Sequence, residues 1–250
     1  MKTAERFSNR VENYVKYRPG YPPELLELFR DEMGLTLDSI MADVGSGTGI
    51  STKLFLENGN AVYAIEPNDA MRAAAEALLS RFPNFHSCNG WAEETGLPDE
   101  YVDFVLAAQA FHWFDPAKTR EEFVRILQRG GHIVLIWNER ELDATAFLRE
   151  YEQFLIRFAK DYTQVRHENV DETALDSFFR KKYRKAVFSN SQVLDLNGLL
   201  GRVLSSSYMP TEADEGFAEM KNDLKTLVAK HAENGNIELS YSTTVYYTRI

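Results

Sequence analysis

Short apolar runs alternate with longer amphipathic runs over residues 23–138. Four runs have the length and apolar character of buried strands, and a fifth, 84–90, is a weaker strand because it is more polar. The four are 40–44, 61–67, 101–109 and 132–138. Four others space their apolar residues as helices do: 23–33, 50–59, 68–82 and 115–131. Asn68 and Asp115 are the expected N-caps, and Gly130 is the expected end of the last of these helices. The alternation is typical of βαβ units and predicts a parallel sheet with helices on both faces.

The pattern changes after Asn138, where a helical insertion is expected over 138–182. The remaining elements expected are a sixth strand at 185–196, helices at about 195–205 and 212–233, and a last strand at 236–250. That last run alternates polar with apolar residues and is rich in Thr, Tyr and Val, as a half-buried strand is. Because no linker interrupts the chain, we expect a single domain over 1–250.

Three glycines follow the first predicted strand in the stretch MADVGSGTGIST, at Gly45, Gly47 and Gly49. A glycine-rich turn between the first strand and the first helix of an open α/β sheet is a cofactor-binding position. The dinucleotide fingerprint needs its third glycine where this chain has Ile50, and no Gly-Lys-Ser/Thr follows for a phosphate loop. The spacing therefore favours a ligand that approaches bare backbone without a pyrophosphate.

Two carboxylates flank this turn. Asp43 precedes the glycines and can accept a hydrogen bond from an ammonium group, while Glu66 ends the second strand and can accept from both hydroxyls of a ribose. A ligand with an adenosine, an amino-acid tail and no phosphate meets these requirements. S-adenosylmethionine is such a ligand, and it is the cofactor that we expect.

Composition and charge exclude several classes of partner and of cellular location. The formal net charge of −10 argues against binding nucleic acid, and no apolar run is long enough to cross a membrane. The N-terminal residues lack the apolar core of a signal peptide, and the single cysteine, Cys88, excludes an intrachain disulfide. We expect a cytoplasmic protein without a metal site; the oligomeric state stays open.

Four motifs together resemble the class I S-adenosylmethionine-dependent methyltransferases of the small-molecule type (methyltransferase type 11). They are YVKYRPGYP, DVGSGTG, VYAIEPN and NGWAEETGLPDEYVDFVLAAQAFHWFD. The first and the HWFD of the last are similar to the subgroup that contains trans-aconitate methyltransferases. The resemblance implies a Rossmann-like, doubly wound α/β fold with a seven-stranded, mostly parallel sheet. In that fold the last strand is antiparallel, and here the helical insertion follows the fifth strand.

The resemblance also implies the cofactor contacts. Asp43 would face the methionine part and Glu66, followed by Pro67, would bind the ribose. The other residues implied are Gly45, Ser46 and Gly47 in the turn, Asn68 or Met71 beside the adenine, Trp91 and Ala92 over the adenine, and Gln109 near the methionine end. Trp91 stands where the family commonly has Asp, so Glu93 or a backbone carbonyl would have to meet the adenine amine. Arg18 is our candidate for the methionine carboxylate.

The substrate side is predicted from the segments outside the sheet. Residues 1–22 would form a lid arm and residues 138–182 part of a substrate cap, and His112 is the candidate catalytic base. The candidate acceptor contacts are Tyr14, His112, Trp113, Arg140, Arg202 and Tyr208. The arginines favour an anionic acceptor, whereas Trp113, Phe114 and Trp137 would instead suit an apolar one; the sequence leaves both open.

The function predicted is methyl transfer from S-adenosylmethionine to a small-molecule acceptor, with a trans-aconitate-like carboxylic acid as the leading class. Two alternatives stay open at this point. One is a non-catalytic S-adenosylmethionine-binding or partner protein, and the other is a nicotinamide-dependent oxidoreductase, which the glycine spacing disfavours.

Overall fold

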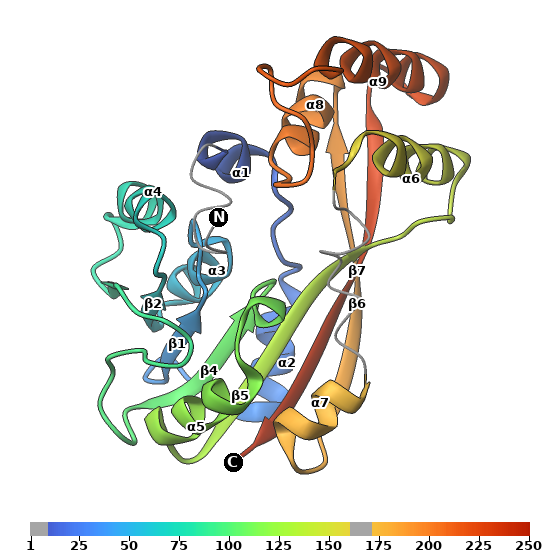
Figure 1. Cartoon of the computed structure of the whole chain (residues 1–250). Coiled ribbons are helices and arrows are strands. Elements are labelled where there is room, and N and C mark those ends of the chain that lie inside the picture. Colours follow the sequence, from blue (N-terminus) through green and yellow to red (C-terminus); the bar gives the residue numbers. More distant parts are fainter. Residues whose placement is uncertain (1–9, 161–171) are drawn as a thin grey trace.

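The computed structural model describes residues 10–160 and 172–250, which form one seven-stranded sheet in the order β3-β2-β1-β4-β5-β7-β6 (Figure 1). The strands are β1 (Ile40–Val44), β2 (Ala61–Ile65), β3 (Phe85–Cys88), β4 (Val102–Ala108), β5 (Leu127–Arg140), β6 (Arg184–Leu194) and β7 (Ile237–Arg249). β7 runs antiparallel to both β5 and β6, and the pairs among β1 to β5 are parallel. The predicted fold class is confirmed.

Helices connect and cover these strands. They are α1 (Val11–Tyr17), α2 (Glu24–Met33), α3 (Ile50–Asn58), α4 (Asp69–Leu79), the short 3-10 helix η2 (Phe111–Trp113), α5 (Pro116–Ile126), α6 (Ala146–Phe158), α7 (Glu172–Phe179), α8 (Leu196–Leu204) and α9 (Phe217–His231). Both predicted N-caps are confirmed. The Asn68 side chain accepts a hydrogen bond from the Met71 N–H, and Asp115 accepts from the first turn of α5.

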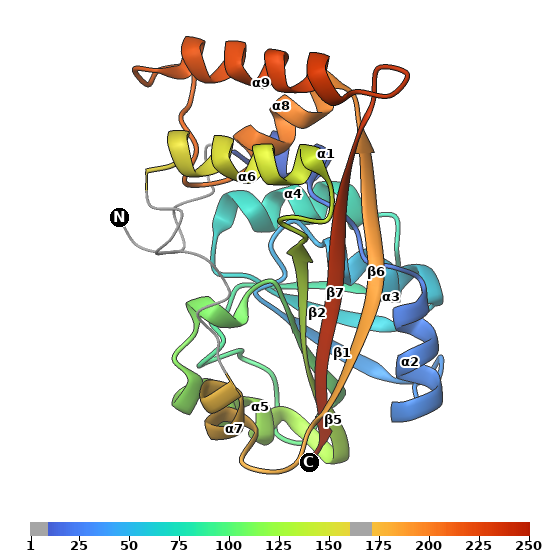
Figure 2. The same ribbon diagram turned by 90° about the vertical axis from the view of Figure 1, so that its right-hand side faces the viewer.

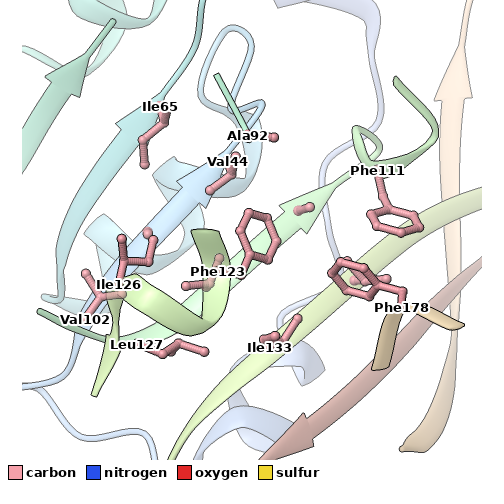
Figure 3. Packing of buried hydrophobic residues seen from close by; sticks show 14 of the residues in the cluster. Val44, Ile65, Ala92, Val102, Phe111, Phe123, Ile126, Leu127, Ile133 and Phe178 are labelled. Atoms are coloured by element: carbon pink, nitrogen blue, oxygen red, sulfur yellow. The ribbon is translucent and has the colours of Figure 1, made fainter. Parts of the chain in front are cut away.

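The central strands are buried on both faces, as their continuous apolar sequences require. Along β4, Val105 and Ala107 belong to one apolar cluster, while Phe104 and Leu106 belong to the other. The first cluster lies under α5 and α7, where Phe123 and Phe178 pack against the strands (Figure 3). The second lies under α2 and α3. The alternation places successive side chains of one strand in two separate cores.

A third apolar cluster stands apart from these two and is built from α6, α8, α9 and the first residues of β7. These three helices gather at the end of the sheet where β5 ends and β7 begins (Figures 1 and 2). The predicted insertion over 138–182 divides between the two regions, because α6 joins this cluster whereas α7 packs beside α5. Residues 161–171 of that insertion, and 1–9 of the predicted arm, lie outside the described residues.

One predicted boundary is wrong. The helix expected over 115–131 ends at Ile126, and β5 begins directly with Leu127, which pairs with Val102. Gly130 has a φ of +82° and lies inside β5, next to a shift in the register with β4. The glycine therefore marks an irregularity within the strand, where left-handed backbone is needed, and not the end of a helix.

Candidate cofactor-binding and active site

A cavity opens at the carboxyl ends of β1, β4 and β5, under α1 and α8. Most of the predicted methionine-end and acceptor residues meet there. Among the described residues, its polar and aromatic lining consists of Tyr14, Arg18, Tyr21, Ser46, Ser51, Gln109, His112, Trp113, Asn138, Arg140, Arg202, Ser207, Tyr208 and Tyr241. Gly45 and Gly47 add bare backbone to the same wall. The position is the one where open α/β sheets bind their ligands.

The backbone angles and close neighbours of the turn after β1 explain why it contains glycines. Gly45 has a φ of +71°, and a Cβ there would lie 2.6 Å from the Cβ of Ala110. Gly49 has a φ of +83°, and its Cβ would lie 2.5 Å from Leu79. Any other residue would meet both backbone strain and a neighbour. The turn therefore approaches its surroundings as bare backbone and leads directly into the first turn of α3.

Asp43 lies behind this turn and is not part of the cavity lining. Its Oδ2 accepts hydrogen bonds of 2.6 Å from the hydroxyls of Ser51 and Thr52. Its Oδ1 has no partner among the described residues, although the side chain is fully buried. Burial raises the pKa of Asp43 to about 6, against the opposing effect of the two hydroxyls.

Glu66 ties the end of β2 to the glycine turn. Its two carboxylate oxygens accept from the backbone N–H groups of Gly47 at 2.9 Å and Asn68 at 2.8 Å. Burial raises its pKa, in opposition to those two bonds. Pro67 follows directly, and the terminal methyl of Met71 lies 3.4 Å from where a Cβ on Gly47 would be. Glu66, Pro67 and Met71 are therefore grouped at the turn but outside the cavity lining.

The predicted adenine segment lies in the loop between β3 and β4. Ala92 is buried, whereas the Trp91 side chain is 51% exposed, and the Trp91 backbone pairs with Glu94. Glu93, expected to reach the adenine amine, instead accepts a 2.8 Å hydrogen bond from the Asp115 N–H at the start of α5. This oxygen of Glu93 is therefore engaged by the start of α5.

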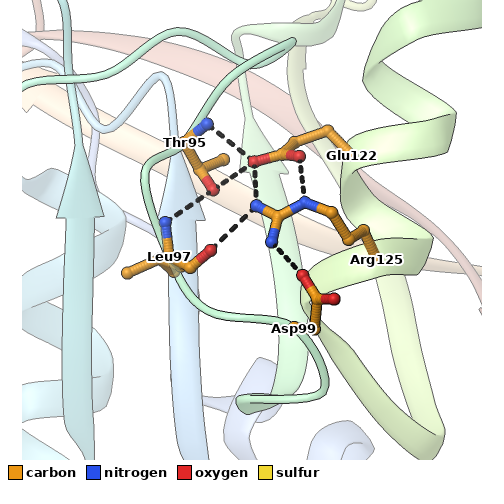
Figure 4. Close-up of polar contacts among 5 residues, drawn as sticks. All are labelled: Thr95, Leu97, Asp99, Glu122 and Arg125. Carbon is orange, nitrogen blue, oxygen red and sulfur yellow. Dashed lines mark hydrogen bonds and ion pairs between the residues drawn. The ribbon is translucent and has the colours of Figure 1, made fainter.

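A polar network anchors the same loop to α5 (Figure 4). The buried Glu122 accepts from the Thr95 N–H at 2.8 Å and from its hydroxyl at 2.6 Å, and it pairs with Arg125 at 2.7 Å. Arg125 also donates to the Leu97 carbonyl and contacts Asp99. These bonds hold the residues that follow Trp91 and Ala92 against the helix.

Two polar residues follow the apolar parts of β4 and β5: Gln109 comes directly after β4, and Asn138 lies near the end of β5. Gln109 has a φ of +58°, which is unusual for a residue with a Cβ, and its side-chain amide donates to the Asn138 carbonyl at 2.9 Å. The Asn138 amide in turn donates to the Gly20 carbonyl at 3.0 Å. Sequence reasoning selected Gln109 but missed Asn138. The same signal, a polar residue at the end of an apolar run, would have found it.

Arg18 and Arg202 meet at the Ser206 hydroxyl, which accepts from the first at 3.4 Å and from the second at 3.2 Å. Arg18 also donates to the Ser205 carbonyl at 3.0 Å. Both Nε atoms are buried and have no hydrogen-bond partner in the described parts of the chain. Burial lowers the pKa of Arg18, and the like charge of Arg202 lowers it further. No ion pair of either arginine with a carboxylate is found within 10–160 and 172–250.

The comparisons with known proteins agree with this geometry. A family model described as a methyltransferase domain matches residues 42–135. An uncharacterized methyltransferase of Mycobacterium tuberculosis is 31% identical over 240 residues, which cover 95% of this chain and 92% of that protein. The chain belongs to the class I S-adenosylmethionine-dependent methyltransferases.

Further similar proteins are also named as methyltransferases. An uncharacterized methyltransferase-like protein of Schizosaccharomyces pombe is 28% identical over 244 residues, covering 96% of this methyltransferase and 93% of the relative. A solved structure of a putative type II methyltransferase from Anaeromyxobacter dehalogenans superimposes with a TM-score of 0.67 at 20% identity, over 93% of this chain and 98% of the other. That structural likeness supports the fold of the methyltransferase.

The residues of the methyltransferase fit its cofactor, S-adenosylmethionine. The methionine end of the cofactor is a zwitterion, and within the described residues Oδ1 of Asp43, behind the glycine turn, and Nε of Arg18, in the cavity wall, have no hydrogen-bond partner. The remaining acceptor candidates also face the cavity: His112 lies against the Trp113 ring at 4.7 Å, and Arg140 pairs with Glu152 and lies over the Tyr151 ring. Sequence reasoning missed Tyr21 and Tyr241, which line the cavity as well.

The described residues contain no helix that is both long and apolar enough to cross a membrane. Within the same residues, no group of three or more His, Cys, Asp or Glu side chains is arranged to hold a metal ion.

Proposed function

We propose that this methyltransferase transfers a methyl group to a small, negatively charged acceptor, with a carboxylic acid as the leading class. One observation carries the proposal. Among the described residues that line the cavity there are three arginines and no carboxylate, and Arg140 alone of the three pairs with a carboxylate beside the wall, that of Glu152. Arg18 and Arg202 are left with buried donors and like charges. A buried cation without a counter-charge is costly, so anionic ligands are the natural complement.

The cofactor side uses the first of these arginines. Arg18 would grip the methionine carboxylate, and Asp43 would accept from the ammonium through its free Oδ1. Glu66 would accept from the ribose hydroxyls with the lone pairs that its two backbone bonds leave available. The adenine would lie among Pro67, Met71, Trp91 and Ala92, and the methionine end along Gly45, Ser46, Gly47 and Gln109.

The acceptor side uses the rest of the cavity. Arg202 would hold the anion, with Arg140, Tyr208 and Tyr14 around it and Trp113 as an apolar wall. The cofactor supplies a methyl group on a positively charged sulfur. An acceptor oxygen would take up this methyl group through a lone pair, and the electron pair of the carbon–sulfur bond would stay with the leaving thioether. An ionised carboxylate loses no proton in this step, whereas a hydroxyl acceptor would give its proton to His112.

The remaining task of the chain is alignment and the exclusion of water. α1 and α8 cover the cavity together, since Tyr14 and Arg18 line it from one side and Arg202 from the other. The backbone of the arm is fixed by side chains of the sheet: Gln192 donates to the Tyr17 carbonyl at 2.9 Å and Asn190 to the Gly20 carbonyl at 3.0 Å. We assign the arm, within the described part of 1–22, as the lid, and α6 as the part of 138–182 that belongs to the cap.

Transfer of a tritiated methyl group from S-adenosylmethionine to a panel of small carboxylic acids tests this proposal. Wild type, Arg202→Gln and the control Arg149→Gln, an exposed arginine outside the cavity, are compared on each acid that is methylated. Loss of a charge-assisted contact should lower kcat/KM by about tenfold to a hundredfold in Arg202→Gln, with the control unchanged. Transfer to neutral acceptors alone, or equal rates in all three proteins, would contradict an anionic acceptor.

A further inference from the structure

Tyr241 is a buried phenol of the cavity wall that the roles above do not use. It lies near the start of β7, where it pairs with Arg140 of β5 and Asn190 of β6. The side chain is 2% exposed, and its ring packs in the cluster formed with α6, α8 and α9. Its hydroxyl nevertheless borders the cavity, beside the Arg202 guanidinium, and donates no hydrogen bond within the described residues. Burying an O–H donor without an acceptor costs free energy, so this group calls for an explanation.

The neighbours of Tyr241 place it on the acceptor side of the cavity. Arg202 is the adjacent cation: burial opposes its charge, but Tyr241, Tyr151 and Tyr208 favour it, and the pKa of Arg202 is raised as a result. Arg202 directs one side of its guanidinium to the hydroxyls of Ser205 and Ser206 and keeps its Nε free. The Arg202 guanidinium on α8 and the Tyr241 hydroxyl on β7 thus lie beside each other. A contact with the guanidinium uses a lone pair of the phenol oxygen, so the O–H of Tyr241 is left to donate.

We propose that Tyr241 is an acceptor-binding residue, whose hydroxyl donates to a second oxygen of the acceptor next to the anionic group that Arg202 holds. The inference rests on the proposed anionic acceptor and adds a selection rule to it. A site built to hydrogen-bond an oxygen rejects ligands that lack it, because the buried donor then stays unpaired. The cavity therefore favours acceptors with a second hydrogen-bond-accepting oxygen over simple monocarboxylates.

Matched pairs of acids of equal length test this rule: malonate with propionate, succinate with butyrate, and glutarate with valerate. Their binding is measured calorimetrically at saturating S-adenosylhomocysteine in wild type, Tyr241→Phe, Arg202→Gln and Tyr247→Phe. Tyr241→Phe keeps the ring and so the packing. Tyr247→Phe is the control, because Tyr247 is a buried tyrosine of the same strand that packs under α2 and is not part of the described cavity lining.

We expect Tyr241→Phe to weaken the tightest dicarboxylate by about tenfold and to leave its monocarboxylate partner and S-adenosylhomocysteine unchanged. Equal losses for both acids would show that Tyr241 acts only by holding Arg202, and unchanged binding of both would show that it has no role; either result overturns the inference. If Arg202→Gln still abolishes binding in those cases, the proposed function stands. If wild type binds no acid, or Arg202→Gln binds as wild type does, the anionic acceptor fails and the inference with it.

Discussion

If the buried carboxylate of Asp43 binds the cofactor ammonium as proposed, we predict that cofactor affinity depends on pH. Burial raises its pKa from an ordinary 3.8 to about 6, a shift that corresponds to about 3 kcal/mol. Because the pKa is raised, the contribution of this group to folding stability is complete below pH 4 and is lost as the pH rises through about 6. The ionised form is the one that can accept from the ammonium of the cofactor. Cofactor binding should therefore require the ionised form of Asp43, which burial disfavours in the protein without cofactor.

The magnitude follows directly. At pH 5 about one molecule in ten carries an ionised Asp43, so affinity for S-adenosylhomocysteine should be about tenfold lower than on the plateau above pH 7. Calorimetry from pH 5 to 8 at constant ionic strength measures it, and two buffers of different ionisation enthalpy should reveal proton release below pH 6. Asp43→Asn should bind more weakly and lose most of this dependence.

Glu66 makes a second contribution to the pH dependence, and the Asp43→Asn variant separates the two. Burial raises its pKa as well, so the wild-type curve contains contributions from both carboxylates, and the Asp43→Asn curve keeps only the part due to Glu66. A wild-type affinity that is constant from pH 5 to 8 would refute the reasoning. So would an Asp43→Asn curve that falls below pH 6 as steeply as wild type.

Three further predictions concern the parts that hold the site together. Arg10 donates to the carbonyls of Leu204, Ser206 and Met209 at 2.9, 2.7 and 2.6 Å. Arg10→Gln should therefore lower the free energy of unfolding in urea by about 1–3 kcal/mol and weaken S-adenosylhomocysteine binding, and unchanged stability would contradict this. A Cβ on Gly201 would lie 2.1 Å from the Tyr17 ring, so Gly201→Ala should displace α1 and reduce cofactor affinity, and Tyr17→Ala should restore part of the loss. Glu122→Gln should release the loop after Trp91, which faster proteolysis of that loop would report.

The strands and the glycine turn were predictable because their signals are local. The runs at 40–44, 61–65 and 102–108 are mostly apolar, with Asp43 and Asp103 as the charged exceptions, since most of their side chains are buried on one face or the other. The glycines are required by left-handed backbone at their own positions. The end of α5 was missed for the opposite reason: Leu127 enters the sheet by pairing with the distant Val102, and this pairing overrides the helical pattern.

Candidate site residues could be predicted only where their position in the sequence was itself a signal. Asp43 lies next to the end of β1, and Glu66 and Gln109 directly follow β2 and β4, so these polar residues stand out in the sequence. Tyr241 is one of several aromatic residues in the last strand, and its place in the cavity depends on the antiparallel register of β7 with β5. The engagement of Glu93 with the first turn of α5 depends on a tertiary contact and could not be read from the chain.

Binding of S-adenosylhomocysteine to wild type and Glu66→Ala, measured by calorimetry, tests the central claim most directly. Glu66→Ala removes the carboxylate assigned to the ribose, and Glu57→Ala, on the far end of α3 and outside the described cavity lining, is the control. The account predicts micromolar binding by wild type and the control, and a loss of more than about tenfold, or 1.4 kcal/mol, in Glu66→Ala, with all three proteins folded. Equal affinities in the three proteins, or no binding by wild type, would contradict it.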